Sequence, residues 1–274
     1  MKKTAKRPML TALVLTAILF LCTGCHAKPE EQRMQESFDN ITKIDAEMEI
    51  ADVTLFSCPG EAVILEYCNY GDDRCIIEQQ NGTLRIRREY PRFNWQFLIG
   101  RQKDYTLLIG IPENYTGELS VINTTGKISA AGLSLPGNAA FTVTTGSISL
   151  QNITAAGDMR IRMTTGSIEG KELTCGVLSV TSTTGKVTLA GAADRFEIKT
   201  TTGAVDAELT AVTQSASIET TTGSIRCRIH DSAQNFKITG RTTTGSRDIP
   251  SGGDGPKQLE VNATTGSVRV EFTE

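Results

Sequence analysis

Charged side chains recur at one position of a sequence repeat, and their spacing is the clearest indication of chemistry in this chain. The tripeptide Thr-Thr-Gly occurs eight times, and the third residue after each glycine is Ser129, Ser149, Glu169, Thr188, Asp206, Arg226, Asp248 and Arg269. Glycan-cleaving enzymes built from stacked β-strand repeats cluster carboxylates and a basic residue from neighbouring repeats. Asp206 and Arg226 would be such neighbours. Alternating charges on a solvated face predict the same pattern, so we assign no catalytic residue.

Metal and thiol chemistry is weakly indicated. The chain has two histidines, His26 and His230, too few for a histidine-based triad or zinc site. Asp72-Asp73 and the glycine-rich run at 252–255 lack the repeated aspartates of calcium loops. The cysteines after residue 25 contain no Cys-x-x-Cys pair; they are Cys58, Cys68, Cys75, Cys175 and Cys227. We expect no metal and no cofactor, leave a Cys68–Cys75 bridge open, and expect Cys227 to be a small core residue.

Residues 1–24 have the features of an export signal. Four basic residues precede an apolar run from Met9 to Cys22, whose 14 residues are few for a membrane span. The end of the run, Leu21-Cys22-Thr23-Gly24-Cys25, resembles a bacterial lipobox, although Cys22 stands where leucine is usual. We therefore predict that Cys25 is a lipid anchor and that residues 25–40 form a polar tether. The alternative is ordinary secretion with cleavage after Ala27.

The repeat itself predicts how the chain folds. The repeat glycines are 18 to 22 residues apart and are Gly126, Gly146, Gly166, Gly185, Gly203, Gly223, Gly245 and Gly266. The residues five before them are apolar with one exception, namely Val121, Phe141, Ile161, Val180, Ile198, Ile218, Gly240 and Val261. Apolar residues lie at odd offsets before each glycine and at even offsets after it. A straight strand cannot change parity, so the chain must bend at these corner glycines.

Repeats of about 20 residues with this pattern fit the coils of a β-solenoid. We predict an all-β chain, with an N-terminal β cap or sandwich-like region over residues 41–118 and about eight solenoid coils over residues 119–274. The same parity places the threonine before each glycine inside the corner. Only one outward threonine column then remains, which argues against an ice-binding face. We expect the seventh coil to be irregular with a protruding loop, because Arg247 replaces an apolar residue and Gly and Pro follow.

The N-terminal region contains further strand signals. Residues 44–56, 62–67, 76–79, 84–88 and 104–111 are strand-like, and Asn81-Gly82 indicates a hairpin. Residues 90–103 hold Phe93, Trp95 and Phe97, which fit either a lid over the solenoid end or a binding loop.

Several of these segments resemble one protein family. Ile-Thr-Lys-Ile at 41–44, Asn-Gly-Thr-Leu-Arg-Ile at 81–86, Leu-Ile-Gly-Ile-Pro at 108–112 and the repeated Thr-Thr-Gly-x-Ile are similar to bacterial adhesin-type proteins of the DUF4097 family. The resemblance implies a β-strand repeat protein, often exported or membrane-associated, with no established enzymatic activity.

Charge and composition limit the partners. The formal net charge is −3, and residues 25–274 carry 24 basic and 31 acidic residues, or −7, so nucleic acid is not expected as a partner. We predict a non-catalytic cell-surface lipoprotein, serving as an adhesin or as an envelope scaffold or sensor. The membrane, through the lipid, and an envelope glycan or protein are the expected partners. The alternative is a glycan-active or glycan-binding β-solenoid enzyme of the envelope.

Overall fold

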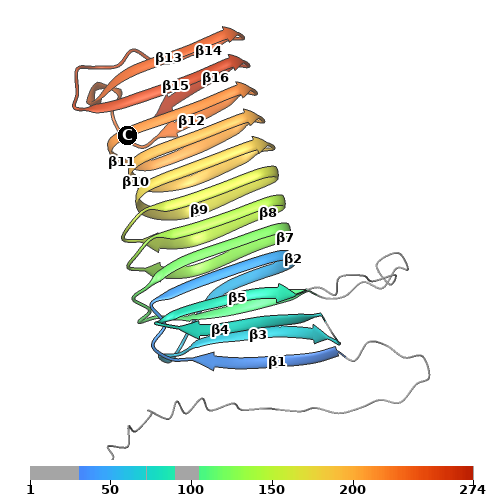
Figure 1. The fold of residues 1–274 in the computed structure, drawn as a ribbon. Helices are drawn as coiled ribbons and strands as arrows, with labels where there is room; N and C mark the ends of the chain where they lie inside the picture. The colour runs from blue at the N-terminus through green and yellow to red at the C-terminus, as the bar shows by residue number, and fades with distance from the viewer. Residues whose placement is uncertain (1–30, 72, 90–104, 274) are drawn as a thin grey trace, which may run out of the picture.

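The protein is an elongated stack of strands that bend around one hydrophobic core (Figure 1). The computed structural model describes residues 31–71, 73–89 and 105–273. The strands are β1 (Glu31–Phe38), β2 (Lys43–Cys58), β3 (Val63–Tyr70), β4 (Arg74–Gln80), β5 (Thr83–Glu89), β6 (Thr106–Pro112), β7 (Glu118–Leu135), β8 (Ala139–Ala155), β9 (Met159–Thr184), β10 (Val187–Thr202), β11 (Val205–Thr222), β12 (Ile225–Ile229), β13 (Phe236–Thr244), β14 (Arg247–Asp248), β15 (Lys257–Thr265) and β16 (Val268–Phe272). The all-β solenoid predicted from the repeat is confirmed.

Successive coils pair in parallel, one repeat apart, and among the described layers the pairing shifts in register only in the segment 189–195 of β10. In the β7–β8 pair, Val121 lies opposite Phe141 and Gly126 opposite Gly146. The apolar columns before and after each glycine point inward, and most of their members are less than 5% exposed. Each coil thus has a first side before its corner glycine and a second side after it. Stacking identical columns buries apolar side chains that a single coil would leave in water.

The corner glycines are required for two separate reasons. All eight have positive φ angles, between 126° and 149°, which residues with a side chain rarely adopt. In addition, a Cβ atom on any of them would overlap a backbone carbonyl oxygen of the adjacent layer; for Gly166 this is the oxygen of Gly146. A second bend follows six residues later in the first coils, at Gly132, Asn152 and Glu172, again with positive φ.

The threonines before the corner glycines face solvent, so the expectation that they point inward is wrong. Both threonines of every Thr-Thr-Gly are exposed, and the inward position is the residue three before the glycine. Three polar side chains at that position donate to the corner carbonyl of the preceding layer. They are Asn123 to Ala51 at 2.7 Å, Thr220 to Gly203 at 3.4 Å and Thr242 to Gly266 at 2.8 Å. These three side chains therefore link neighbouring layers at the corner.

The solenoid continues into the N-terminal region. β2 forms a layer beneath β7, with Ala51 opposite Gly126 in the corner position. β5 and β6 together form the layer beneath β2. Antiparallel strands end the stack, with β4 on one side and β3 then β1 on the other. The strands expected in this region are confirmed, and Asn81-Gly82 forms the β4–β5 hairpin turn with φ angles of 50° and 75°.

Residues 31–38 were expected to lie in the polar tether, but they form β1. This strand pairs with β3 along its whole length. Met34 and Phe38 pack against the core, and Tyr67 donates to Glu36 at 2.5 Å. Exposed and partly buried side chains alternate along β1, as in other strands. One of the partly buried positions is Glu36, so the sequence lacks the alternation of polar and apolar residues that would predict a strand.

The last two repeats stack in an order that differs from the sequence. β15 pairs with β11 and β13, and β16 pairs with β12 and β14. The final repeat, with Gly266, therefore lies between the layers of Gly223 and Gly245, and β13 and β14 end the stack (Figure 1). Two hydrogen bonds of 2.8 Å follow this order, from Gly223 N to Thr265 O and from Gly266 N to Thr244 O.

The side chains of the seventh repeat explain this order. Its inward columns contain Gly240 and Arg247, which would leave a void and bury a charge between two layers. At the end of the stack Arg247 is exposed and donates to Gly240 O at 3.0 Å, while Ile249 packs over Gly240. The expected irregularity of this coil is confirmed, and its loop, residues 249–256, contacts the backbone of Ala233.

Candidate functional site

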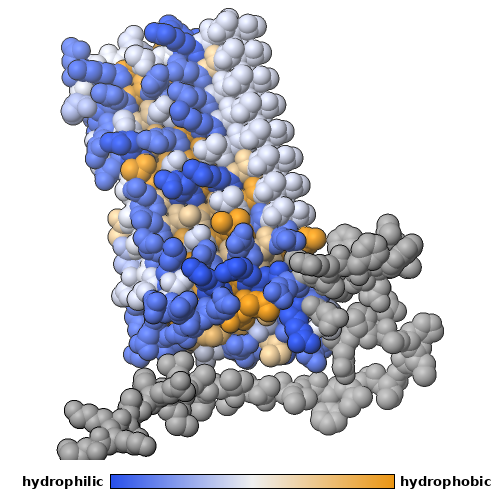
Figure 2. Space-filling view, in the orientation of Figure 1, coloured by the Kyte–Doolittle hydropathy of each residue, from blue (hydrophilic) through white to orange (hydrophobic). Residues whose placement is uncertain are grey.

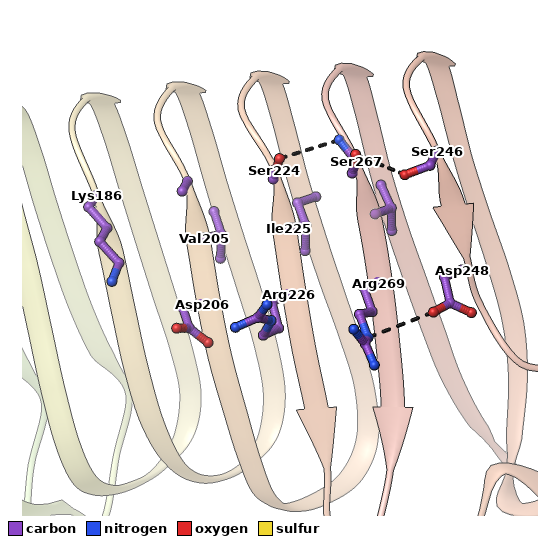
Figure 3. Close-up of a pocket in the computed structure, with 12 residues that line it drawn as sticks. Lys186, Val205, Asp206, Ser224, Ile225, Arg226, Ser246, Asp248, Ser267 and Arg269 are labelled. Carbon is purple, nitrogen blue, oxygen red and sulfur yellow. Dashed lines mark hydrogen bonds and ion pairs between the residues drawn. The ribbon is translucent and has the colours of Figure 1, made fainter.

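A groove of about 500 Å³ on the second side of the last layers is the best candidate for a site. It crosses the layers of Gly185, Gly203, Gly223, Gly266 and Gly245. Its walls are two rows of outward side chains, one directly after the corner and one two residues further along (Figure 3). The row nearer the corner includes Lys186, Ser224, Ser267 and Ser246.

The second row is charged, and the strand register sets its order. Asp206 lies opposite Arg226, Arg226 opposite Arg269, and Arg269 opposite Asp248. The predicted proximity of Asp206 and Arg226 is therefore confirmed, but Arg269 separates Arg226 from Asp248. Arg269 forms ion pairs with Asp248 at 3.7 Å and Glu271 at 2.6 Å. Across the described chain, no carboxylate lies within 4.0 Å of the Arg226 guanidinium.

The charged side chains next to this row pair with one another. Glu208 contacts Arg228 at 3.8 Å and His230 at 2.9 Å, and Arg228 contacts Glu271 at 3.8 Å. All these side chains are between 31% and 43% exposed, so each pair adds little to stability.

Carboxylate spacing in the groove does not match a glycosidase. Asp206 and Asp248 are three layers apart, which at about 4.8 Å per layer is about 14 Å. Retaining and inverting glycosidases need carboxyl groups about 5 Å and about 6.5–9.5 Å apart. Asp206 and Glu208 are closer, but Glu208 is bound by Arg228 and His230. Elsewhere, hydrogen bonding from Lys171 lowers the pKa of Glu169, opposite to the shift of a general acid.

Two columns of exposed threonines form a ridge along the corner, visible as a pale strip down one edge in Figure 2. The reason given for excluding an ice-binding face, a single outward column, is therefore wrong. The two columns are adjacent in sequence, so both can face outward only on the convex side of a bend. They form a narrow ridge rather than the flat face that ordered water requires.

Sequence reasoning missed a buried polar cluster at the N-terminal end. Arg88 contacts Asp73 at 2.6 Å, with both side chains 1% exposed, and donates to Cys68 O at 2.6 Å. Tyr105 donates to Asp73 at 2.7 Å, and its ring lies 4.6 Å from the Arg88 guanidinium. These contacts join residues that are 15 to 32 positions apart in the sequence, so no local sequence pattern predicts them. Asp73, considered above as part of an acidic pair, is thus a structural ion-pair partner.

The cysteines of the described chain are free and buried. The Cys68–Cys75 bridge is therefore not formed; Cys68 contacts Glu31 at 3.5 Å, and Cys75 accepts from Arg88 at 3.4 Å. Cys227 is fully buried in its column, as expected, and burial raises the pKa of its thiol to about 12. Residues 31–71, 73–89 and 105–273 contain no cluster of His, Cys, Asp and Glu that could hold a metal ion.

Three expectations fall outside the described residues. They are the export signal at 1–24, the lipid anchor at Cys25 and the aromatic segment with Phe93, Trp95 and Phe97. Within the described part of the chain, no helix has the length and apolarity needed to cross a bilayer.

Comparison with known proteins agrees with the fold. The family model for Toastrack DUF4097 matches residues 41–273, and the chain belongs to this family. No curated protein matches the chain.

Several solved structures are similar to this chain. One, named a "putative lipid binding protein", is from Parabacteroides distasonis; it is 16% identical, with 89% of this chain and 97% of that chain covered and a TM-score of 0.52. Another, named a "putative adhesin", is from Bacteroides fragilis; it is 14% identical, with coverage of 89% and 100% and a TM-score of 0.49. At these identities the likeness concerns the fold.

Proposed function

We propose that this protein is a non-catalytic, lipid-anchored rod at the bacterial cell surface that binds an envelope component, as an adhesin, scaffold or sensor. The observation that carries the proposal is the continuous stack of parallel-paired layers. Such a stack is rigid, exposes a long repetitive surface and has open grooves on its described layers. Proteins of similar fold are named for adhesion and lipid binding, which are binding roles.

The anchor rests on the sequence before the first strand. Cys25 ends the lipobox-like segment, and β1 begins at Glu31. Five residues, 26–30, then separate the lipid from the stack, and at about 3.3 Å per residue they span at most about 17 Å. The N-terminal end of the rod would lie near the bilayer and the groove at the far end. Several acyl chains make such attachment stable, whereas one chain is marginal.

Fractionation of cells that express the full chain tests the anchor. The wild type should incorporate labelled fatty acid and remain with membranes, and Cys25→Ser should lose the label and enter the soluble fraction. Cys22→Leu, which restores the residue usual at that position, is the matched control and should keep the label. An unlabelled wild type, or a membrane-bound Cys25→Ser variant, would refute the anchor.

A turnover assay tests the absence of catalysis. The purified full chain should produce no new reducing ends from cell-wall polysaccharides during prolonged incubation. Turnover that disappears in an Asp206→Asn variant would instead establish the glycan-active alternative.

A further inference from the structure

The exchanged order of the last two layers brings together two arginines that sequence order would keep apart. In the sequence, the charged row reads Asp206, Arg226, Asp248, Arg269, a perfect alternation. In the structure it reads Asp, Arg, Arg, Asp, because β16 inserts between β12 and β14. Arg226 and Arg269 are therefore directly opposite each other on adjacent parallel strands.

Like charges in this position repel each other unless a counter-charge is present. Arg269 has two carboxylate partners, Asp248 and Glu271. Arg226 has none within 4.0 Å in the described chain, although Asp206 is its neighbour in the row. The planar guanidinium of Arg226 thus retains N–H donors that can bind an oxyanion through two parallel hydrogen bonds.

The groove has two further cations beside Arg226. They are Lys186 and Arg269; Asp206 and Asp248 also line the groove, and Arg269 is paired with Glu271 next to it. The serine row adds hydroxyl groups on the corner side (Figure 3). Ser246 donates to Ser267 at 2.9 Å, and Ser224 accepts only a long bond of 3.4 Å from Ser267 N. The hydroxyl hydrogen of Ser224 is therefore free to turn toward a ligand.

We propose that this groove binds the oxyanion groups, phosphate or carboxylate, of an extended anionic envelope polymer, with Arg226 as the main ligand and Arg269 and Ser224 beside it. The groove is open and crosses several layers, so it suits a chain of repeated charges better than a single small ion. A polymer is favoured over a lipid surface because the groove is at the end of the stack opposite β1. This inference deepens the proposed function by supplying its ligand class.

Binding of labelled polyphosphate and polygalacturonate to the purified full chain tests the proposal and separates the two oxyanions. Wild type should bind at least one polymer, with affinity that falls as salt rises. Arg226→Gln should weaken binding by about tenfold or more, the loss expected for a hydrogen bond to a charged group. The matched control is Arg162→Gln, an exposed arginine on the first side of the stack. It should bind like wild type, and both variants should unfold at the wild-type urea midpoint.

Three results would overturn the proposal. One is equal binding by wild type and Arg226→Gln, and another is no binding of wild type to either polymer. The third is binding to anionic lipid vesicles but to neither polymer, which would make the membrane surface the partner. Competition by inorganic phosphate would assign the site to phosphate. The Cys25 experiment is independent, so failure here leaves the anchored rod intact, and loss of the anchor leaves the groove intact.

Discussion

Replacing one corner glycine with alanine is the sharpest test of how the layers are held together. Gly166 is suited to this because it lies in the middle of the stack, with Gly146 below it and Gly185 above it. Its φ angle is 139°, and an added Cβ would overlap the carbonyl oxygen of Gly146. The substitution adds a single methyl group and changes no charge.

The expected cost has two parts. Backbone strain for a residue with a side chain at such a φ is about 1–3 kcal/mol. Relieving the overlap requires the two layers to separate locally, which weakens at least one or two interlayer hydrogen bonds of about 1 kcal/mol each. Gly166→Ala should therefore destabilise the protein by about 3 kcal/mol or more. With a urea slope near the upper typical value of about 3 kcal/mol per molar, the midpoint should fall by about 1 M.

Gly132 provides matched controls in the same protein. It also has a positive φ, 66°, but an added Cβ would meet no atom within 4 Å. Gly132→Ala should cost only the left-handed strain of about 1–2 kcal/mol. Gly132→Asn should cost less, because Asn152 occupies the corresponding place in the next coil with a φ of 52°. Equal losses for Gly166→Ala and Gly132→Ala in urea unfolding of the full chain would refute the argument from layer contact.

Two further predictions concern the C-terminal end. Deleting residues 257–274 should release the layer of Gly245, because β13 and β14 pair with β15 and β16 in the described structure. Amides of residues 236–248 should then lose hydrogen-exchange protection, and retained protection would contradict the stacking order. The hydrogen bond from Lys257, 2.6 Å from Asp231, lowers the pKa of that carboxyl. Its stabilisation is therefore present above a pH of about 4 and lost as the pH falls further. The difference in unfolding midpoint between wild type and Asp231→Asn should shrink from pH 7 to pH 2, and a constant difference would exclude this pair as the cause.

The repeat made most of the architecture predictable from the sequence. The parity change at the corner glycines identified the bend, and the columns such as Val121 and Phe141 are buried as expected. Arg247 also marked the irregular coil. The parity change and the apolar columns are local patterns that recur through the eight repeats, so chance is a poor explanation of them.

The remaining features depend on how distant segments meet. The bend spreads over the residues from two before to one after each glycine, so a rule that pivots at the glycine alone misplaced the threonines. The available signal for the true inward position was the apolar Val143, Met163 and Ala263, each three residues before its glycine. Polar residues in the same column, such as Asn123 and Thr220, obscured it. β15 and β16 insert before β13 and β14 because Gly240 and Arg247 make the seventh repeat a poorer inner layer than the eighth. Predicting this order requires the two repeats to be compared as inner layers, and no single residue of the sequence indicates it.

The order of the last layers determines the arginine pair and the groove, and disulfide trapping measures it directly. Arg226 and Arg269 are opposite each other on adjacent strands, about 4.8 Å apart between Cα atoms, which is within disulfide range. Arg226 and Asp248 are two layers apart, at about 10 Å, which is too far. The native Cys227 thiol is buried and its pKa is raised to about 12, so it should not compete. The double variant Arg226→Cys/Arg269→Cys should form an intrachain disulfide under mild oxidation, and Arg226→Cys/Asp248→Cys should not; the opposite result would show that the repeats stack in sequence order.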